Sequence, residues 1–375
     1  MRKLPPIPGI LLSALLASCG RPADEGLAPA GETAGRAEVN FANWVTEIGP
    51  GTLAGFERET GIHVNLELIE SNVLLETKLL TGGSGNDVAV PSSNFLARLI
   101  GSGALRKLDR PRLKNLSHLD AVILRQLEAL DPGNQYAVPY LWGTSSFAYN
   151  VARVRQALGG EPPESLAMLF DPQIAERLAP CGITWIDGGG WLMVDLALIY
   201  LGRDPNSERG DDLAAAEAVL KRVRPYVRYI DAARFDTDLA AGETCIAVGP
   251  SGDLLQAREA ARAGGAGNEI RYVLPKEGAV MWIDVLVVPR DAPHPEAAHR
   301  LIDHLLAPAV IAEISNATRF RNANLDADPL IDAALRLEPG IYPAPEVLDR
   351  LHLARGESHE YSRRQTQLWT RIRSR

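Results

Sequence analysis

Short apolar runs alternate with helical stretches along the first third of this chain, and this alternation restricts the fold more than any other feature. Residues 38–44 have a strand pattern, and residues 53–60 have a helical one that ends at Gly61. Glycine there is typical of the left-handed residue that closes a helix. Residues 64–69 alternate between apolar and polar, as in a second strand. Strands separated by helices predict parallel sheets with crossover helices, an α/β fold.

The same alternation continues to the end of the chain. Further strands are expected at residues 88–90, 147–150, 183–186, 245–248 and 285–288. Further helices are expected at residues 73–80, 191–201, 211–223, 252–262, 295–306 and 309–315. The tail from Pro345 onward is polar and predicted to be helical, with Trp369 as its largest apolar side chain. A chain of 375 residues is long enough for two domains of about 150 residues each.

The N-terminus resembles an export signal. Arg2 and Lys3 precede residues 10–17, which are apolar apart from Ser13. This stretch is much shorter than the roughly 20 residues of a membrane-spanning helix, so it predicts a signal peptide.

The signal is followed by features of a lipid-anchored protein. Residues 16–19 read Leu-Ala-Ser-Cys, which resembles the lipobox of bacterial lipoproteins. Residues 1–18 are therefore expected to be a lipoprotein signal peptide, and Cys19 is expected to carry the lipid. An ordinary signal peptide with an incidental cysteine is the alternative. Residues 19–36 are rich in glycine, alanine and proline, a composition typical of a flexible tether.

Charge and cysteine content restrict the partners and the compartment. The formal charge is −8, and removal of residues 1–18 with Arg2 and Lys3 would make it −10. An acidic chain is a poor candidate for binding nucleic acid. The sequence after the signal has no apolar stretch that could span a membrane, so the lipid would be the sole anchor, in the periplasm. Two cysteines, Cys181 and Cys245, remain for a disulfide in an oxidising compartment.

Six short segments resemble the polyamine-binding proteins of bacterial ABC importers, and most closely the putrescine-binding members. They are residues 56–62 (FERETGI), 87–92 (DVAVPS), 138–140 (VPY), 204–207 (DPNS), 275–278 (PKEG) and 322–324 (NAN). The likeness runs in order from about residue 38 to the C-terminus, and Cys181 and Cys245 fall where that family has its disulfide.

The resemblance implies a two-lobed type II periplasmic binding fold with a ligand cleft between the lobes. Lobe 1 is expected to comprise residues 37–144 and 283–328, and lobe 2 residues 149–278 and 333–375. The hinge is expected near residues 145–148, 279–282 and 329–332, where strands cross between the lobes and allow closure over a ligand. The implied partners are a small polyamine or related cationic amine and a membrane permease, with the binding protein a monomer.

The resemblance also implies a set of binding residues. A buried ammonium requires carboxylates, and aromatic faces both attract cations and pack methylene groups. Trp44 corresponds to the family's stacking tryptophan, Ser92 to a hydroxyl in the cleft wall, and Asp253 and Asp284 to the aspartates that hold one ammonium. Trp282 and Phe320 fall at two further aromatic positions of the family, and the phenylalanine replaces a tyrosine.

The opposite end of the implied cleft departs from the family pattern. Val45 and Thr46 stand where the family has serine and aspartate, and Pro250 replaces a cleft tryptophan. The family's distal glutamate falls where Gly190 and Trp191 stand. A one-residue gap would make Glu47 the replacement acid. Alternatively, the ligand has one cationic end, and its other end packs on Trp191 and Val45.

Other functions are less well supported by the sequence. Asp253 and Asp284 could form an acid–base pair in an exported hydrolase, but the sequence suggests no activated nucleophile with a base beside it. The histidines are scattered, so we expect no metal site and no cofactor. A lipoprotein that reports an amine to a membrane sensor, without importing it, is the stronger alternative.

Overall fold

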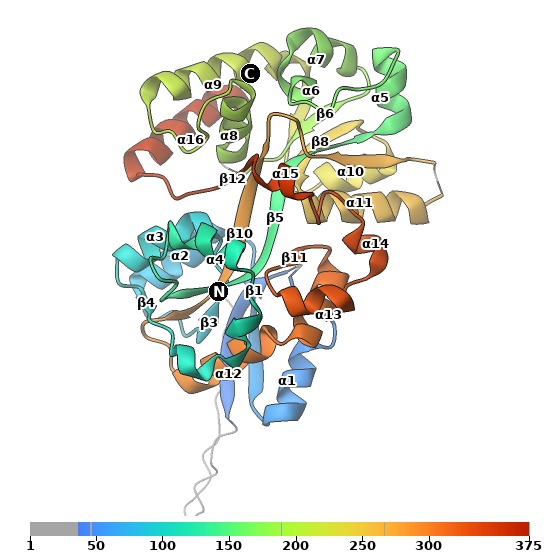
Figure 1. Ribbon diagram of the computed structural model, residues 1–375. Coiled ribbons are helices and arrows are strands. Elements are labelled where there is room, and N and C mark those ends of the chain that lie inside the picture. The colour runs from blue at the N-terminus through green and yellow to red at the C-terminus, as the bar shows by residue number, and fades with distance from the viewer. Residues whose placement is uncertain (1–36, 46, 189, 266, 375) are drawn as a thin grey trace, which may run out of the picture. The chain divides into compact units, whose positions relative to one another are not determined.

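The computed structural model describes residues 37–45, 47–188, 190–265 and 267–374. The predicted signal peptide, Cys19, the tether and Thr46 lie outside these residues. Residues 37–375 form one compact unit, in which two α/β lobes are joined by two long strands (Figure 1). These strands are β5 (Ala137–Asn150) and β10 (Ala279–Pro289), which pair antiparallel along most of their length.

The first lobe is built around parallel strands at one edge of the sheet. β1 pairs parallel with β2 and with β3, and β3 then pairs antiparallel with β10. The strands of this lobe are β1 (Glu38–Trp44), β2 (His63–Ile69), β3 (Val88–Ala89), β4 (Leu105–Arg106) and β11 (Arg321–Asn322). Its helices are α1 (Thr52–Thr60), α2 (Asn72–Thr81), α3 (Ser93–Gly101), α4 (Ala121–Glu128), α12 (Pro295–Leu305) and α13 (Pro308–Thr318).

The second lobe repeats this arrangement. β6 pairs parallel with β7 and β8, while β8 and β9 pair antiparallel with β5. Its strands are β6 (Ile183–Trp185), β7 (Val227–Ile230), β8 (Ile246–Pro250), β9 (Ile270–Val273) and β12 (Leu351–Leu353). Its helices are α5 (Val151–Leu158), α6 (Ala167–Phe170), α7 (Pro172–Leu178), α8 (Trp191–Tyr200), α9 (Gly210–Val223), α10 (Phe235–Ala241), α11 (Ser251–Ala263) and α16 (His359–Arg373), and α14 (Ala333–Arg336) and α15 (Pro345–Leu348) lead into α16.

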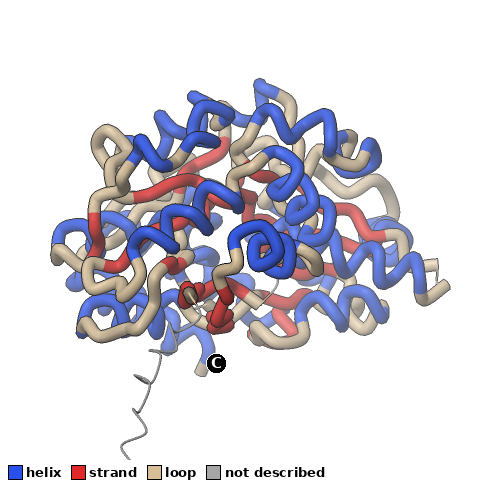
Figure 2. Tube along the Cα trace, turned by 90° about the horizontal axis from the view of Figure 1, so that it is seen from below, coloured by secondary structure: helices blue, strands red, loops and turns tan. Residues whose placement is uncertain are grey.

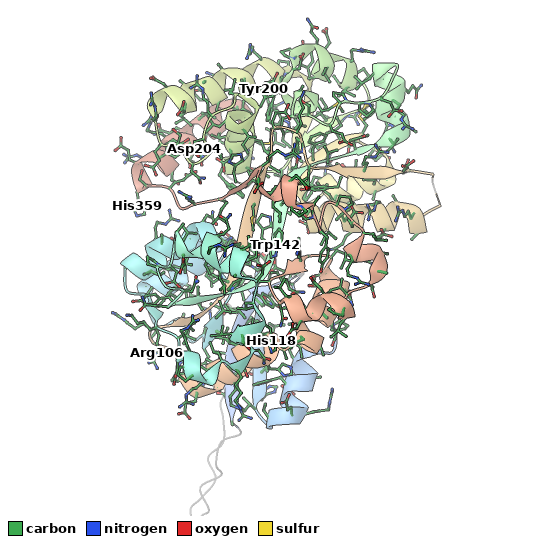
Figure 3. The ribbon with its side chains drawn as sticks, viewed as in Figure 1. Arg106, His118, Trp142, Tyr200, Asp204 and His359 are labelled. Carbon is green, nitrogen blue, oxygen red and sulfur yellow. A yellow bond between two sulfur atoms is a disulfide. The ribbon has the colours of Figure 1, made fainter. Side chains whose placement is uncertain are left out.

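Helices cover the strands on their outer sides (Figure 2), as the alternating sequence predicts for an α/β fold. The buried apolar side chains form two clusters. The larger fills the first lobe and continues into α10, α11 and β9 of the second lobe, and the smaller fills the rest of the second lobe. At the junction, Trp142 of β5 is buried (Figure 3). Its indole N–H donates to the carbonyl of Asn322 at 3.1 Å, and the guanidinium of Arg321 lies 4.9 Å from its ring centre. Trp142 therefore fixes β11 against the crossing strand.

The local predictions hold for most elements, and three need correction. Gly61 closes α1 in the left-handed conformation, with φ of 71°. The strand expected at residues 147–150 begins at Ala137, and the one expected at residues 285–288 begins at Ala279, because both continue across the two lobes. The tail is not continuously helical, because residues 351–353 pair parallel with residues 279–281 of β10.

The predicted disulfide between Cys181 and Cys245 is confirmed, with the two Cα atoms 5.5 Å apart. Cys245 lies directly before β8, and Cys181 lies two residues before β6, which pairs with β8.

Candidate functional site

A cavity of about 780 Å³ lies where parallel strands of both lobes end. Trp44 is the last residue of β1 and Ser92 follows β3, whereas Asp187 follows β6 and Pro250 ends β8; all four line the cavity. In α/β folds, ligands bind beyond the carboxyl ends of the strands, because the loops that can be varied without disturbing the sheet meet there.

The turn after β1 directs an acid into this cavity. The amide of Glu47 donates to the carbonyl of Trp44 at 3.2 Å. The carbonyl of Glu47 itself accepts hydrogen bonds from the Tyr140 hydroxyl at 2.6 Å and from the Asn43 side-chain amide at 2.9 Å. These bonds fix the backbone, and the side chain of Glu47 lines the cavity although it is only 5% exposed. Its Oε2 receives no hydrogen bond from any described donor.

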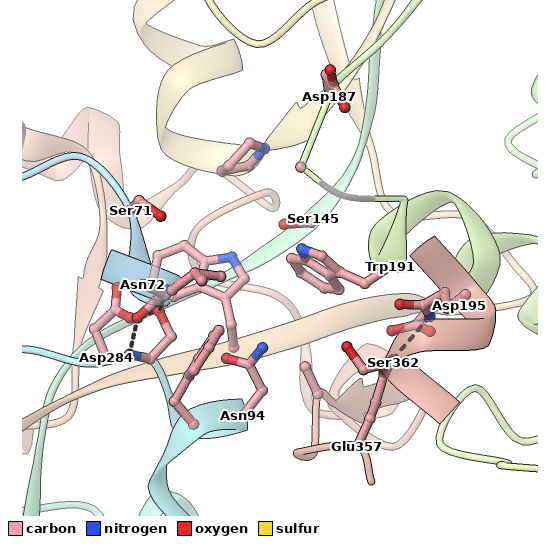
Figure 4. Close-up of a pocket in the computed structure, with 18 of the residues that line it drawn as sticks. Ser71, Asn72, Asn94, Ser145, Asp187, Trp191, Asp195, Asp284, Glu357 and Ser362 are labelled. Atoms are coloured by element: carbon pink, nitrogen blue, oxygen red, sulfur yellow. Dashed lines mark hydrogen bonds between the residues drawn. The ribbon is translucent and has the colours of Figure 1, made fainter. Parts of the chain in front are cut away.

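Asp284 of β10 faces the same space and is 3% exposed. The Ser92 hydroxyl donates to Oδ1 of Asp284 and in turn accepts a hydrogen bond from the Asn72 side-chain amide at 2.9 Å (Figure 4). The amide of Ser92 also donates to Oδ1 of Asn72 at 3.0 Å. Asn72 and Ser92 therefore hold the Asp284 carboxyl in one orientation.

Glu47 and Asp284 form a buried acidic pair. Burial raises the pKa of both carboxyls, and the negative charges of Asp284 and Asp253 raise that of Glu47 further. The hydrogen bonds from Ser92 and Glu47 oppose the increase in the pKa of Asp284. Two buried carboxyls in contact share a proton unless a cation is beside them. This pair is therefore arranged to receive a positively charged group.

Aromatic side chains form the wall beside the pair. The rings of Trp282 and Phe320 meet edge to face, with centres 5.2 Å apart. Glycines make room for both rings: a Cβ atom at Gly143 would lie 2.7 Å from Trp282, and one at Gly252 would lie 2.2 Å from Phe320. The indole nitrogen of Trp44 is buried and has no hydrogen-bond partner among the described residues.

Most of the predicted binding residues therefore lie together. Those that line the cavity are Trp44, Glu47, Ser92, Trp191, Trp282, Asp284 and Phe320. Two residues do not line it. Asp253, in the first turn of α11, acts on Glu47 through its charge, and its own pKa is raised to about 7 by burial and by Asp236. Val45 is 53% exposed.

The far side of the cavity has acids that the family pattern did not predict. Asp195 of α8 and Glu357, in the segment between β12 and α16, both line it. The signal for Asp195 was present in the sequence, because it is the one charged residue in the otherwise apolar run from Trp191 to Ile199.

Gly190, one of the two positions at which the resemblance places a distal glutamate, cannot be replaced by a residue with a side chain without strain. Gly190 has φ of 89°, and a Cβ atom there would lie 2.5 Å from Cγ of Trp369. Gly190→Glu should therefore lower the free energy of unfolding by at least about 2 kcal/mol, through left-handed strain and overpacking. Urea unfolding of the variant beside Gly160→Glu, an open glycine without positive φ, measures this. Equal stability of the two variants would contradict the close packing of Gly190 against Trp369.

The described residues offer little for other kinds of site. They contain no group of three or more histidine, cysteine, aspartate or glutamate side chains placed to hold a metal ion. None of the helices in the described ranges is long and apolar enough to cross a membrane.

Comparison with known proteins identifies the family. Residues 52–336 match the bacterial extracellular solute-binding protein family. The chain is 38% identical over 352 residues to the putrescine-binding periplasmic protein SpuD of Pseudomonas aeruginosa, covering 92% of this chain and 96% of that protein. It is 41% identical over 342 residues to the putrescine/agmatine-binding protein of Pseudomonas aeruginosa strain PAO1, covering 91% and 93% respectively.

Solved structures show the same fold. The spermidine/putrescine ABC transporter substrate-binding protein PotD of Streptococcus pneumoniae superposes with a TM-score of 0.78 at 26% identity, covering 90% of this chain and 99% of that one. The predicted resemblance and the two-lobed α/β binding fold are thus confirmed. These relatives are binding proteins rather than enzymes. This chain therefore belongs to the family of bacterial extracellular solute-binding proteins.

Proposed function

We propose that this chain captures a polyamine or a related cationic amine and delivers it to the permease of an ABC importer. The observation that carries the proposal is the buried pair of Glu47 and Asp284 in a cavity walled by aromatic rings. The other groups whose charges act on this pair are also carboxyls. The names of the relatives, which bind putrescine or agmatine, point to the same class of ligand.

Each part of the site has a role in this proposal. Asp284, oriented by Ser92, and Glu47 bind one ammonium, and the buried carboxyl of Asp253 adds negative charge behind them. Taking an ammonium out of water costs several kcal/mol unless carboxylates of this kind compensate. The faces of Trp44, Trp282 and Phe320 pack the methylene groups and attract the cation. Trp191 contacts the ligand from the second lobe.

We also propose that the lobes close over the ligand. The boundaries inferred from the resemblance divide the chain into residues 37–144 with 283–328 and residues 149–278 with 333–375. The long strands β5 and β10 pass through the proposed hinge at residues 145–148 and 279–282. The ligand would favour the closed state because the acids of the cavity need a cation when water is excluded.

Export and anchoring complete the proposal. The signal peptide at residues 1–18 and the lipidated Cys19 would place the protein in the periplasm, as a monomer attached to a membrane by lipid alone. Loss of amine uptake on deletion of the gene would distinguish import from sensing.

The raised pKa values predict that amine binding depends on pH. Putrescine stays protonated between pH 6 and pH 8, whereas Asp253, with a pKa of about 7, becomes neutral as the pH falls through that range. Glu47 and Asp284 also take up protons on acidification, since their pKa values are raised. We therefore expect calorimetry to show at least about threefold weaker putrescine binding at pH 6 than at pH 8, with proton release on binding.

The neutral analogue 1,4-butanediol is the control for this experiment. It has the length and shape of putrescine without charge, so we expect no binding at either pH. Binding of the diol as tightly as putrescine, or failure of every amine to bind, would overturn the proposed function.

A further inference from the structure

Asp195 is a buried acid without a partner in the wall of the cavity. It is 7% exposed and lies in the middle of α8, among apolar side chains. None of the hydrogen bonds and ion pairs of the described residues involves its carboxyl, which lines the cavity. Because an unpaired buried carboxylate costs several kcal/mol, such a residue needs either a proton or a cation from outside the protein.

The surroundings of Asp195 are acidic and polar. The charged groups that act on it are Glu357 and Asp204, and with burial they raise its pKa well above the ordinary value. Glu357 lines the same cavity and accepts a hydrogen bond from the Gln365 side-chain amide at 2.9 Å. The Tyr361 hydroxyl, whose pKa both acids raise, is buried and lacks a hydrogen-bond partner among the described residues.

The arginines nearby do not neutralise Asp195. Arg98 holds both oxygens of Glu76, at 2.7 and 3.0 Å, and its charge acts on Glu357 but not on Asp195. Arg373 forms an ion pair with Asp187 at 2.9 Å. Arg355 is the third arginine that lines the cavity, and its charge, like that of Arg98, does not act on Asp195. Asp195 therefore faces a space in which none of these three arginines is paired with it.

The position of Asp195 relative to the acidic pair suggests how the space is used. Asp195 lies four residues after Trp191 in α8, about 6 Å farther along the helix axis. In Figure 4 the indole of Trp191 lies between Asp284 on one side and Asp195 with Glu357 on the other. A chain that runs from Asp284 to Asp195 would therefore pass along Trp191.

We propose that Asp195 and Glu357 form a second ammonium subsite, so that the ligand is an extended polyamine with cationic groups at both ends. This inference rests on the proposed function, in which Asp284 and Glu47 bind the first ammonium. The methylene groups between the two ammonium groups pack on Trp191. The acids missing from positions 46 and 190 are thus replaced from a different part of the fold, α8 and the segment before α16.

The test compares α,ω-diaminoalkanes with alkylamines of the same chain length. The monoamine has the same methylene groups but lacks the second charge, so the affinity ratio isolates the second subsite. In the unmodified protein, calorimetry should show the ratio rising with chain length to at least about tenfold, or about 1.4 kcal/mol. In Asp195→Asn and in Glu357→Gln the advantage of the long diamine should fall to less than about threefold, while the monoamine binds as before.

Retained monoamine binding shows that each variant is folded. Glu360→Gln is the matched control, because Glu360 is exposed in the first turn of α16 and does not line the cavity. This control should keep the full advantage of the diamine. If amines bind but Asp195→Asn leaves the advantage unchanged, Asp195 is a protonated structural residue and the second subsite is wrong. If no amine binds the unmodified protein, the proposed function itself is wrong.

Discussion

Replacement of both Cys181 and Cys245 by alanine should lower the free energy of unfolding by about 4 kcal/mol. The disulfide joins residues separated by 64 positions, and in the chain-entropy account a cross-link across a loop of this length restricts the unfolded chain by about that amount. In the folded state it connects the starts of two neighbouring strands. The amide of Cys245 donates to the carbonyl of Gly182 at 2.9 Å, and Ile183 pairs with Ile246.

Urea unfolding of the double variant beside the unmodified protein measures this effect. The unmodified protein treated with a thiol reductant is the second arm, and it should lose a similar amount without any change of sequence. Neither cysteine lines the cavity, so amine affinity at low temperature should be retained. A loss below about 1 kcal/mol in both arms would show that restriction of the unfolded chain contributes little here.

The sequence predicted elements whose signals are local. The strand at residues 38–44 and the helix that ends at Gly61 depend on neighbouring residues, and both were located to within one residue. The length of β5 could not be predicted in the same way, because Pro139 and Gly143 ordinarily interrupt strands. In the structure, Pro139 pairs with Val285 at a bulge, and Gly143 makes room for Trp282. These contacts come from residues far away in the sequence.

The residues of the candidate site also differ in how far the sequence could predict them. Trp44, Ser92 and Asp284 could be located by resemblance because they follow or lie in strands whose order is shared by the family. The resemblance could not show that Gly190 is packed against Trp369, since that contact joins residues that are far apart in the sequence. Nor could it show that Asp195 and Glu357, more than 150 positions apart in the sequence, line one cavity.

Asp284→Asn should weaken the binding of every cationic amine at least about tenfold, which corresponds to about 1.4 kcal/mol. Asparagine has nearly the same shape and keeps an oxygen that can accept the hydrogen bond from Ser92, so the change removes charge and little else. Removing one partner of a buried ion pair can cost about 3–5 kcal/mol, so the loss could approach a thousandfold. Calorimetry with putrescine and with butylamine measures it, and Asp349→Asn, an exposed acid away from the cavity, is the matched control.

The free protein should respond in the opposite direction. In the absence of a cation, burial disfavours a charge on either carboxyl, and Asp284 raises the pKa of Glu47 further. Asp284→Asn removes one of the two charges, so the thermal midpoint of the free variant should equal or exceed that of the unmodified protein. Replacing a residue that binds ligand at the expense of stability weakens ligand binding and leaves the free protein equally or more stable. Replacing a structural residue does not give these two results together. Lower stability together with unchanged amine affinity would show that Asp284 supports the fold and that the ammonium binds elsewhere.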